Sequence, residues 1–187
     1  MITEFTFKNQ LILAMPTLTD PNFERTVTLI CEHNSEGAMG VVINRPSVVS
    51  VAEILRQSQV EVPPTLSEHI MAFEGGPVQQ DHGFVIHTPV GEWASSMRVS
   101  DDIALTTSRD ILVALNSDRA PHRYLVAMGY AGWGAGQLEN ELIENAWLTA
   151  PATTDLIFET PFHEMRAAAA ATIGIDMSRL ASGFGHA

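Results

Sequence analysis

Cys31 and His33, separated by Glu32, are the residues whose types and spacing best suit nucleophilic or redox chemistry. In a β-strand, residues i and i+2 point to the same side, so the thiol and the imidazole could form a pair. Two features favour a structural role instead. Glu32 would raise the thiol pKa, and a cysteine in line with Val27 and Leu29 is typical of a small buried hydrophobic residue. The segment therefore indicates either a thiol-based redox sensor or a buried cysteine.

A second group of polar and glycine residues falls at the ends of expected strands. If these ends converge, the residues could line a pocket for a ligand. The alternative is that Asn44-Arg45-Pro46 and Gly75-Gly76-Pro77 are tight turns, with the arginine in solvent. The members of this group are Asn44, Arg45, Glu74, Gly75, Gly76, His82 and His87.

A glycine-rich segment follows the strand expected at residues 124–130. Its glycines, Gly129, Gly132, Gly134 and Gly136, do not match the G-x-G-x-x-G spacing, and no lysine follows as in a P-loop. We therefore interpret the segment as a sharp turn that presents Trp133 as a candidate surface residue. An acidic helix is expected from about residue 137, where Glu139, Glu141 and Glu144 would repel an anion but could bind a protein partner.

Other motifs fail on inspection. His163-Glu164 begins like a zinc-protease helix, but the second histidine position holds Ala167. Ser108 is explained by helix capping, and the chain contains no G-x-S-x-G elbow. We predict no catalytic residue, metal site or cofactor.

Composition restricts the class of partner. The chain has 187 residues, a length that fits a single domain over 1–187, and a formal net charge of −12 with only ten lysines and arginines. A protein that binds duplex DNA typically neutralises about 6 to 10 phosphates, which would require nearly every lysine and arginine of this chain. Direct nucleic-acid binding is therefore disfavoured. An anionic membrane surface is disfavoured for the same reason.

The cellular location is expected to be the cytoplasm. A single cysteine excludes an intramolecular disulfide and suits a reducing compartment. The apolar run at residues 11–15 is too short for a signal peptide or a membrane span, so no membrane association is expected.

Hydrophobic periodicity and turn residues predict an α+β fold, because hairpin-like strand pairs recur without a regular βαβ alternation. Strands are expected at 10–15, 25–32, 38–43, 70–74, 83–87, 96–99, 103–106, 124–130 and 155–158. Turn residues at 34–37 predict a hairpin of the second and third of these strands. Helices are expected at 50–58, where Ser50 fits a capping box, at 107–116, from 137 onward and at 160–174.

Several blocks together resemble the AlgH/YqgE family. They include residues 18–25 and 30–34, Gly37-Ala38-Met39-Gly40, Asn44-Arg45-Pro46, Gly75-Gly76-Pro77, Gly129-Tyr130-Ala131-Gly132-Trp133, residues 137–139 and 145–151, and Gly185-His186-Ala187. The resemblance implies a bacterial cytoplasmic protein with a mixed, strongly curved sheet that forms a pseudo-barrel with flanking helices. It also implies a link to transcriptional regulation and alginate biosynthesis, without an established biochemical activity.

The leading hypothesis is a non-enzymatic cytoplasmic regulatory protein that influences transcription indirectly, through an unknown protein partner or small ligand. One alternative is a small enzyme or a redox sensor that uses Cys31. Another is an adaptor that binds a protein through its acidic helix.

Overall fold

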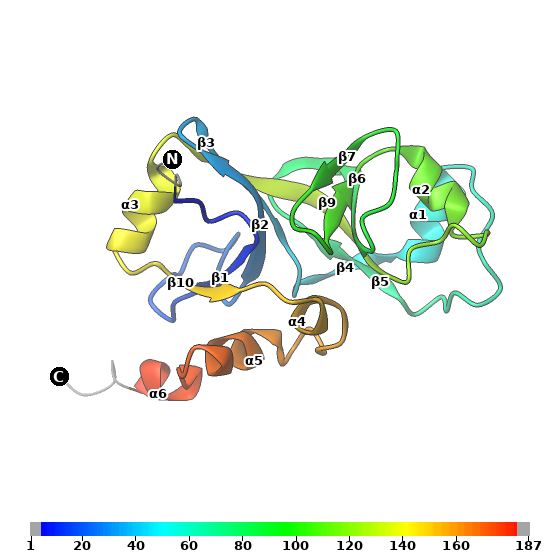
Figure 1. Cartoon of the computed structure of the whole chain (residues 1–187). Coiled ribbons are helices and arrows are strands. Elements are labelled where there is room, and N and C mark those ends of the chain that lie inside the picture. Colours follow the sequence, from blue (N-terminus) through cyan, green and yellow to red (C-terminus); the bar gives the residue numbers. More distant parts are fainter. Residues whose placement is uncertain (1–4, 183–187) are drawn as a thin grey trace.

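The computed structural model describes residues 5–182, so the Gly185-His186-Ala187 block lies outside the described residues. Over this range the chain forms ten strands and six helices (Figure 1). The strands are β1 Gln10–Ala14, β2 Val27–Asn34, β3 Gly37–Val42, β4 Pro46–Ser50, β5 Met71–Glu74, β6 Val78–Thr88, β7 Ser96–Arg98, β8 Ala104–Thr106, β9 Arg123–Gly134 and β10 Trp147–Pro151. The helices are α1 Val51–Gln57, α2 Arg109–Ala114, α3 Gln137–Ile143, α4 Thr154–Phe158, α5 Met165–Thr172 and α6 Met177–Ser182.

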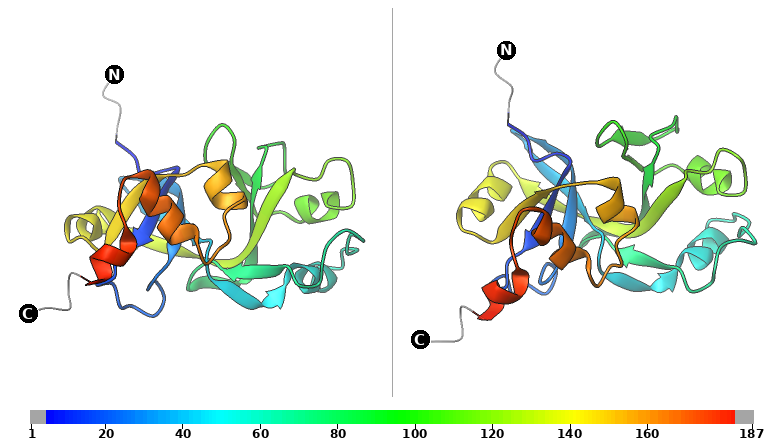
Figure 2. Two further views of the ribbon diagram at one scale, coloured as in Figure 1. Left: turned by 90° about the horizontal axis from the view of Figure 1, so that it is seen from below. Right: turned by 60° about the horizontal axis from the view of Figure 1, so that its bottom comes forward.

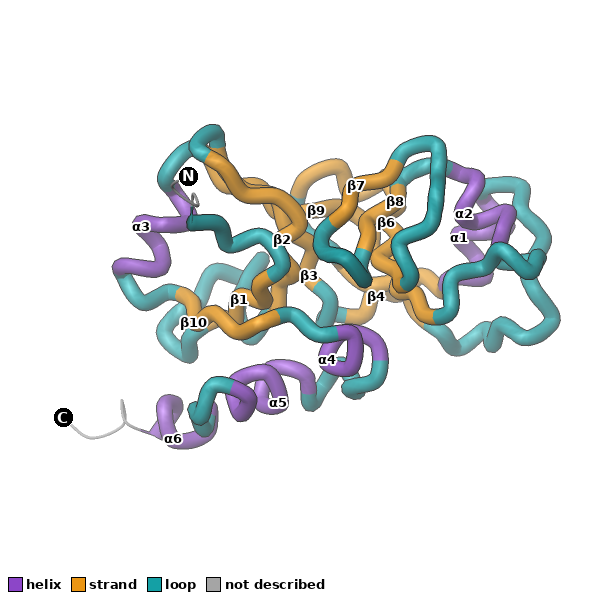
Figure 3. Tube along the Cα trace, viewed as in Figure 1, coloured by secondary structure: helices purple, strands orange, loops and turns teal. Residues whose placement is uncertain are grey.

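The strands join in a strongly curved mixed sheet with flanking helices, which confirms the expected α+β pseudo-barrel. Its main path runs β10-β1-β2-β3-β9-β6-β8-β7, and β4 and β5 branch from it. Helices α4 to α6 follow one another along β1 and β10, while α1 and α2 lie at the opposite end of the molecule (Figures 2 and 3). The sheet thus has two ends, joined through β3 and β9.

The hairpin of β2 and β3 forms as predicted, but it contains a bulge. The turn is stabilised by the Asn34 side chain, which accepts a hydrogen bond from the backbone N–H of Glu36 at 2.8 Å. Along the ladder Ile30 pairs with Gly40 and Glu32 pairs with Met39, so Cys31 has no cross-strand partner. A one-residue bulge reverses which side of the sheet the following residues face.

The branch of the sheet lies where β5 meets β9. The Gly75 N–H donates to the Met128 carbonyl at 2.8 Å, and the Gly75 carbonyl accepts from the Val42 N–H at 2.9 Å. A Cβ atom on Gly75 would lie only 2.3 Å from the carbonyl oxygen of Gly129. Only a residue without a side chain allows the two backbones to approach this closely.

Both faces of the N-terminal strands are buried. Leu11 and Leu13 of β1 join the largest hydrophobic cluster, which α5 covers with Ala169. Ile12, on the other face of β1, packs in a second cluster with Leu138 of α3. A third cluster fills the space beneath α1 and α2. Two covered faces explain why residues 10–15 lack the alternation of a half-buried strand.

Three details of the predicted elements are wrong. Residues 155–158 are not a strand but part of α4, because the Thr153 side chain accepts a hydrogen bond from the Leu156 N–H at 3.2 Å and caps a helix. The helix expected from residue 160 begins at Met165. The glycine segment is not a turn at Gly132, since β9 continues to Gly134 and the left-handed residue that precedes α3 is Gly136.

Replacing Gly75 with alanine tests the close backbone approach at the branch. We expect Gly75→Ala to lower the free energy of unfolding by about 3 kcal/mol, because the new methyl group would overlap the Gly129 carbonyl. Urea denaturation measures this change. Gly132→Ala on β9 is the matched control, since its methyl group would meet nothing closer than 3.7 Å. Equal stability of the two variants would contradict the assignment.

Candidate functional site

The structure places Cys31 and His33 on opposite sides of the sheet. Cys31 belongs to the largest hydrophobic cluster and is fully buried. Its thiol donates to the Leu29 carbonyl at 3.5 Å, and burial raises the pKa of the thiol to about 12. Beyond the bulge, the His33 ring packs against Phe7, a neighbour of the second cluster. The described residues therefore contain no Cys31–His33 contact, and a redox role stays a prediction.

His33 instead connects β2 to α3. Its Nδ1 atom accepts from the Phe7 N–H at 3.1 Å, so the proton resides on Nε2, which donates to the Glu139 carboxylate at 2.5 Å. The pKa of the Glu139 carboxyl is lowered by its own backbone N–H and by the His33 ring. This contact ties the first acidic residue of α3 to the sheet.

Glu141 is likewise directed inward. Its carboxylate accepts from the indole N–H groups of Trp133 at 3.4 Å and Trp147 at 3.3 Å. Trp133 is only 6% exposed, and its ring packs against Phe23 and Trp147. Trp133 is thus part of the second hydrophobic cluster rather than the surface of a turn, and two of the three predicted adaptor carboxylates are engaged within the molecule.

Asn44 and Arg45 hold the loop at residues 20–25. The Asn44 side chain accepts from the Val27 N–H at 2.8 Å and donates to the Arg25 carbonyl at 3.0 Å. The Arg45 guanidinium donates to three further carbonyls of the loop, those of Pro21, Asn22 and Glu24, each at 3.0 Å. Arg45 is therefore bonded to the main chain of a neighbouring segment.

The remaining members of the strand-end group do not converge. Glu74 is adjacent to Arg45, whose carbonyl accepts from the Glu74 N–H at 2.8 Å, and its side chain is exposed. Gly75 lies at the branch described above, and Gly76 follows it, where a Cβ atom would lie 2.1 Å from the carbonyl carbon of Tyr130. His82 pairs with Asp81 on the exposed part of β6. His87 lies towards the far end of β6, opposite Tyr124 of β9. Asn44, Arg45, Glu74 and the two glycines are neighbours, and the histidines lie elsewhere.

His87 is fully buried in a polar network of its own. Its Nδ1–H donates a hydrogen bond to the Pro89 carbonyl at 2.9 Å, and Nε2 lies 2.7 Å from the Thr106 hydroxyl. That hydroxyl is 2.9 Å from the Ser96 hydroxyl. Burial lowers the pKa of His87, partly offset by the Pro89 carbonyl. The network joins β6, β7 and β8 around a neutral imidazole.

An apolar groove that was not foreseen from the sequence lies beside the branch of the sheet. It has a volume of about 550 Å³ and is lined by residues of β4, β5 and β9 and by the segment that follows α4. Ile70 and Phe162 are 51% and 41% exposed there, and the Phe73 and Phe162 rings meet at 6.2 Å. Large apolar side chains exposed together mark a binding surface.

The groove has few polar groups. Ser47 and His69 lie in its lining, together with the Tyr124 phenol, for which the structure records no hydrogen bond. Burial raises the pKa of this phenol, so it is a neutral donor at physiological pH. Mainly apolar walls with a few orienting polar groups are typical of small-molecule sites.

Within residues 5–182, no three His, Cys, Asp or Glu side chains are grouped as metal ligands would be. No helix in the same range is long and apolar enough to cross a membrane.

A family model described as AlgH-like matches residues 11–178. The chain belongs to the AlgH-like family. A protein of this family from Nitrosococcus oceani, named UPF0301, is 49% identical over 97% of both chains. A UPF0301 protein from Thioalkalivibrio sulfidiphilus is 50% identical over the full length of both.

Solved structures agree with the AlgH-like assignment. The solution structure of AlgH from Pseudomonas aeruginosa matches with a TM-score of 0.79 and 44% identity, and the match covers 100% of this chain and 99% of that one. A Corynebacterium diphtheriae protein matches with a TM-score of 0.73 at 19% identity, over 92% of this chain and 90% of that one. The second likeness shows that the fold persists at low identity.

The burial of Cys31 predicts a slow thiol. We expect a disulfide reagent to modify the folded AlgH-like chain at least about a hundred times more slowly than the urea-unfolded chain, because the thiolate is the reacting species and burial suppresses it. Absorbance of the released thiolate follows both reactions. A folded-state rate equal to the unfolded one would support the redox hypothesis instead.

The His87 network predicts pH-dependent stability. Below about pH 6.5 the unfolded chain gains a proton on His87 that the folded protein resists, so the free energy of unfolding falls as the pH falls. We expect His87→Gln to reduce this slope in urea titrations between about pH 7.5 and about pH 5.5. His122→Gln, at an exposed position, is the control and should retain the slope of the original chain. An unchanged slope in His87→Gln would contradict the prediction.

Proposed function

We propose that this protein is a non-enzymatic cytoplasmic regulator that senses a small, largely apolar ligand in the groove between β4, β5, β9 and the segment after α4. The single observation that supports ligand binding is the groove itself. Its volume of about 550 Å³ falls within the range of roughly 300 to 1,000 Å³ typical of small-molecule sites.

The lining defines the kind of ligand. Ile70, Met71 and Phe162 offer exposed apolar contacts, and Tyr124 offers one neutral hydroxyl donor. No lysine or arginine contributes to this lining. A neutral molecule with an aliphatic or aromatic body and one hydrogen-bond acceptor matches these groups. A strongly charged ligand would lose its hydration without gaining a counter-charge.

The regulatory part of the proposal rests on the regulatory label of the AlgH/YqgE family, which the chain resembles. The net charge of −12 supports an indirect effect on transcription, because a negatively charged protein is repelled by the phosphates of DNA. Ligand occupancy would then be communicated through a protein partner. The groove borders the branch of the sheet, so a ligand there contacts β5 and β9 where they diverge.

A neutral hydrophobic dye tests the groove. We expect Nile red fluorescence to rise saturably with added protein, and Ile70→Asp and Phe162→Ala to weaken dye affinity by about tenfold, because each removes apolar contact area. Val113→Asp is the matched control, since Val113 is a similarly exposed apolar residue on α2, outside the groove. Circular dichroism confirms that each variant is folded.

Two results would overturn the proposal. One is the absence of saturable dye binding. The other is equal loss of affinity in Val113→Asp and Ile70→Asp, which would indicate adsorption on scattered apolar residues rather than a built site.

A further inference from the structure

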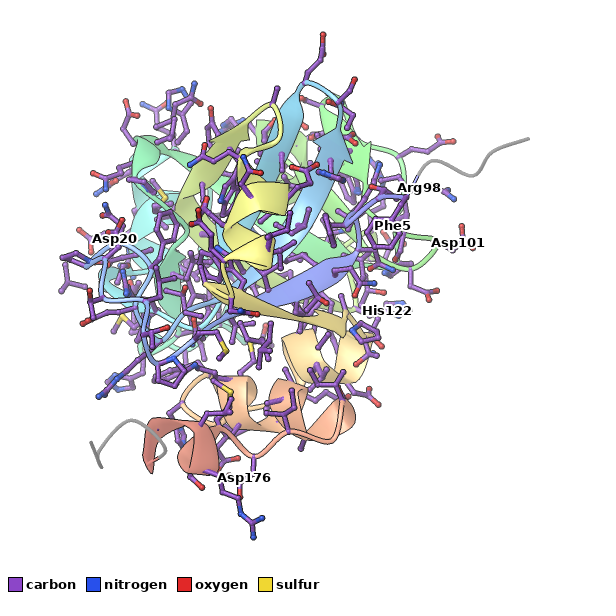
Figure 4. The ribbon with its side chains drawn as sticks, turned by 90° about the vertical axis from the view of Figure 1, so that its left-hand side faces the viewer. Phe5, Asp20, Arg98, Asp101, His122 and Asp176 are labelled. Carbon is purple, nitrogen blue, oxygen red and sulfur yellow. The ribbon has the colours of Figure 1, made fainter. Side chains whose placement is uncertain are left out.

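A second cavity, of about 570 Å³, lies between the segment after β1, the loop that ends at Arg25, and helices α5 and α6. Figure 4 shows Asp20 of that loop and Asp176 of the α5–α6 connection at the surface of the molecule. The cavity shares none of its lining with the apolar groove. We call it the arginine pocket, after Arg25 and Arg166 in its wall.

Arg25 is held at the pocket by its backbone. It has a φ of 60°, a left-handed conformation uncommon for a residue with a side chain. Asn44 fixes this conformation by binding the Arg25 carbonyl and the Val27 N–H, while Arg45 binds the carbonyls on the preceding side of the loop. The Arg25 guanidinium itself has no hydrogen bond or ion pair within the described residues.

Arg166 reaches the pocket from α5. Its Nε atom donates to the Ala14 carbonyl at 2.9 Å, and Nη2 donates to the same oxygen. This two-donor contact fixes the plane of the guanidinium and leaves Nη1 without a partner. Arg25 and Arg166 line the same cavity. Burial, and then the positive charge of Arg25, lower the pKa of Arg166.

Two arginines in one cavity, neither in an ion pair within the described residues, are unexpected in this chain. It carries 22 acidic residues against 10 basic ones, yet within residues 5–182 no carboxylate forms an ion pair with either guanidinium. Glu24 contributes to the pocket wall, so the three charged side chains of the wall sum to one positive charge. An anion bound between the arginines would remove their repulsion and satisfy their free N–H donors.

We propose that the arginine pocket binds a phosphate monoester with a small apolar organic group. A phosphate monoester presents three strong acceptor oxygens, so it can accept from both guanidinium groups and a hydroxyl at once, whereas a carboxylate has only two oxygens. The Thr17 and Thr19 hydroxyls are further donors in the wall. Met15, Leu18 and Met177 supply apolar surface, and the volume exceeds that needed for bare phosphate.

Isothermal titration of the full chain with four probes tests the class of ligand. The probes are phenyl phosphate, inorganic phosphate, benzoate and phenol. We expect phenyl phosphate to bind most tightly, inorganic phosphate and benzoate at least about tenfold more weakly, and phenol not measurably, because phenyl phosphate alone combines a dianion with an apolar ring. Benzoate binding as tightly as phenyl phosphate would overturn the assignment to phosphate esters.

Variants locate the site. Arg25→Gln should weaken phenyl phosphate binding by about tenfold or more, because one charged donor is lost while the backbone hydrogen bonds of the loop remain. Arg98→Gln is the matched control. It removes one arginine that lies on the opposite side of the view in Figure 4 from Asp20, and should change affinity less than about twofold. Equal affinity of Arg25→Gln and the original chain would overturn the proposal.

Asn44→Ala separates positioning from contact. Asn44 does not line the pocket, yet it holds the Arg25 carbonyl. We expect weaker phenyl phosphate binding in a variant that is still folded by circular dichroism.

The apolar groove serves as an internal reference, because Nile red binding should be unaffected by Arg25→Gln. Failure of either site therefore leaves the other testable.

Discussion

The close approach of two backbones at Gly75 and Gly129 is the constraint on which the rest of the structure depends. On one side β9 pairs with β6, and on its other side it pairs first in parallel with β5 and then antiparallel with β3. The exchange of β5 for β3 takes place where Gly75 bonds to both Met128 and Val42. Because no side chain intervenes, one long strand can carry both ends of the molecule, and the groove lies where β4 and β5 diverge from the main path.

Several buried or partly buried polar side chains connect the helices and strands of the sheet to one another. Glu139 and Glu141 connect α3 to His33 and to two tryptophans, and His87 connects three strands. Buried polar groups cost free energy unless they are hydrogen-bonded, and each of these side chains is hydrogen-bonded through at least one atom, while the second carboxylate oxygen of Glu141 has no partner among the described residues. The best-buried carboxylates of this acidic chain bind internally. The guanidinium groups of Arg25 and Arg166 differ, because neither forms an ion pair within the described residues.

The sequence was sufficient where a local signal decides the structure. Turn residues at 34–37 predicted the hairpin, and the Ser50 cap predicted α1, in which the Ser50 hydroxyl accepts from the Glu53 N–H at 3.1 Å. Prediction from the sequence failed where contacts between segments far apart in the chain determine the structure. The bulge at Cys31 depends on the register with β3. Among the glycines of β9, Gly129 is required by the backbone of Gly76 and Val78, which are distant in the chain, rather than by a turn. The groove and the arginine pocket are each lined by segments far apart in the chain, so no spacing pattern reveals them.

Arg45 binds its neighbouring loop entirely through main-chain carbonyl oxygens, which every amino acid possesses. The position of the loop is therefore largely independent of the side chains at residues 22 and 24. Those side chains can change in size and charge while the loop, and the Arg25 that follows it, stay in place. The main-chain hydrogen bonds that hold the arginine pocket in place are thus separate from the side chains that line it. This separation allows ligand preference to diverge among proteins that share one fold.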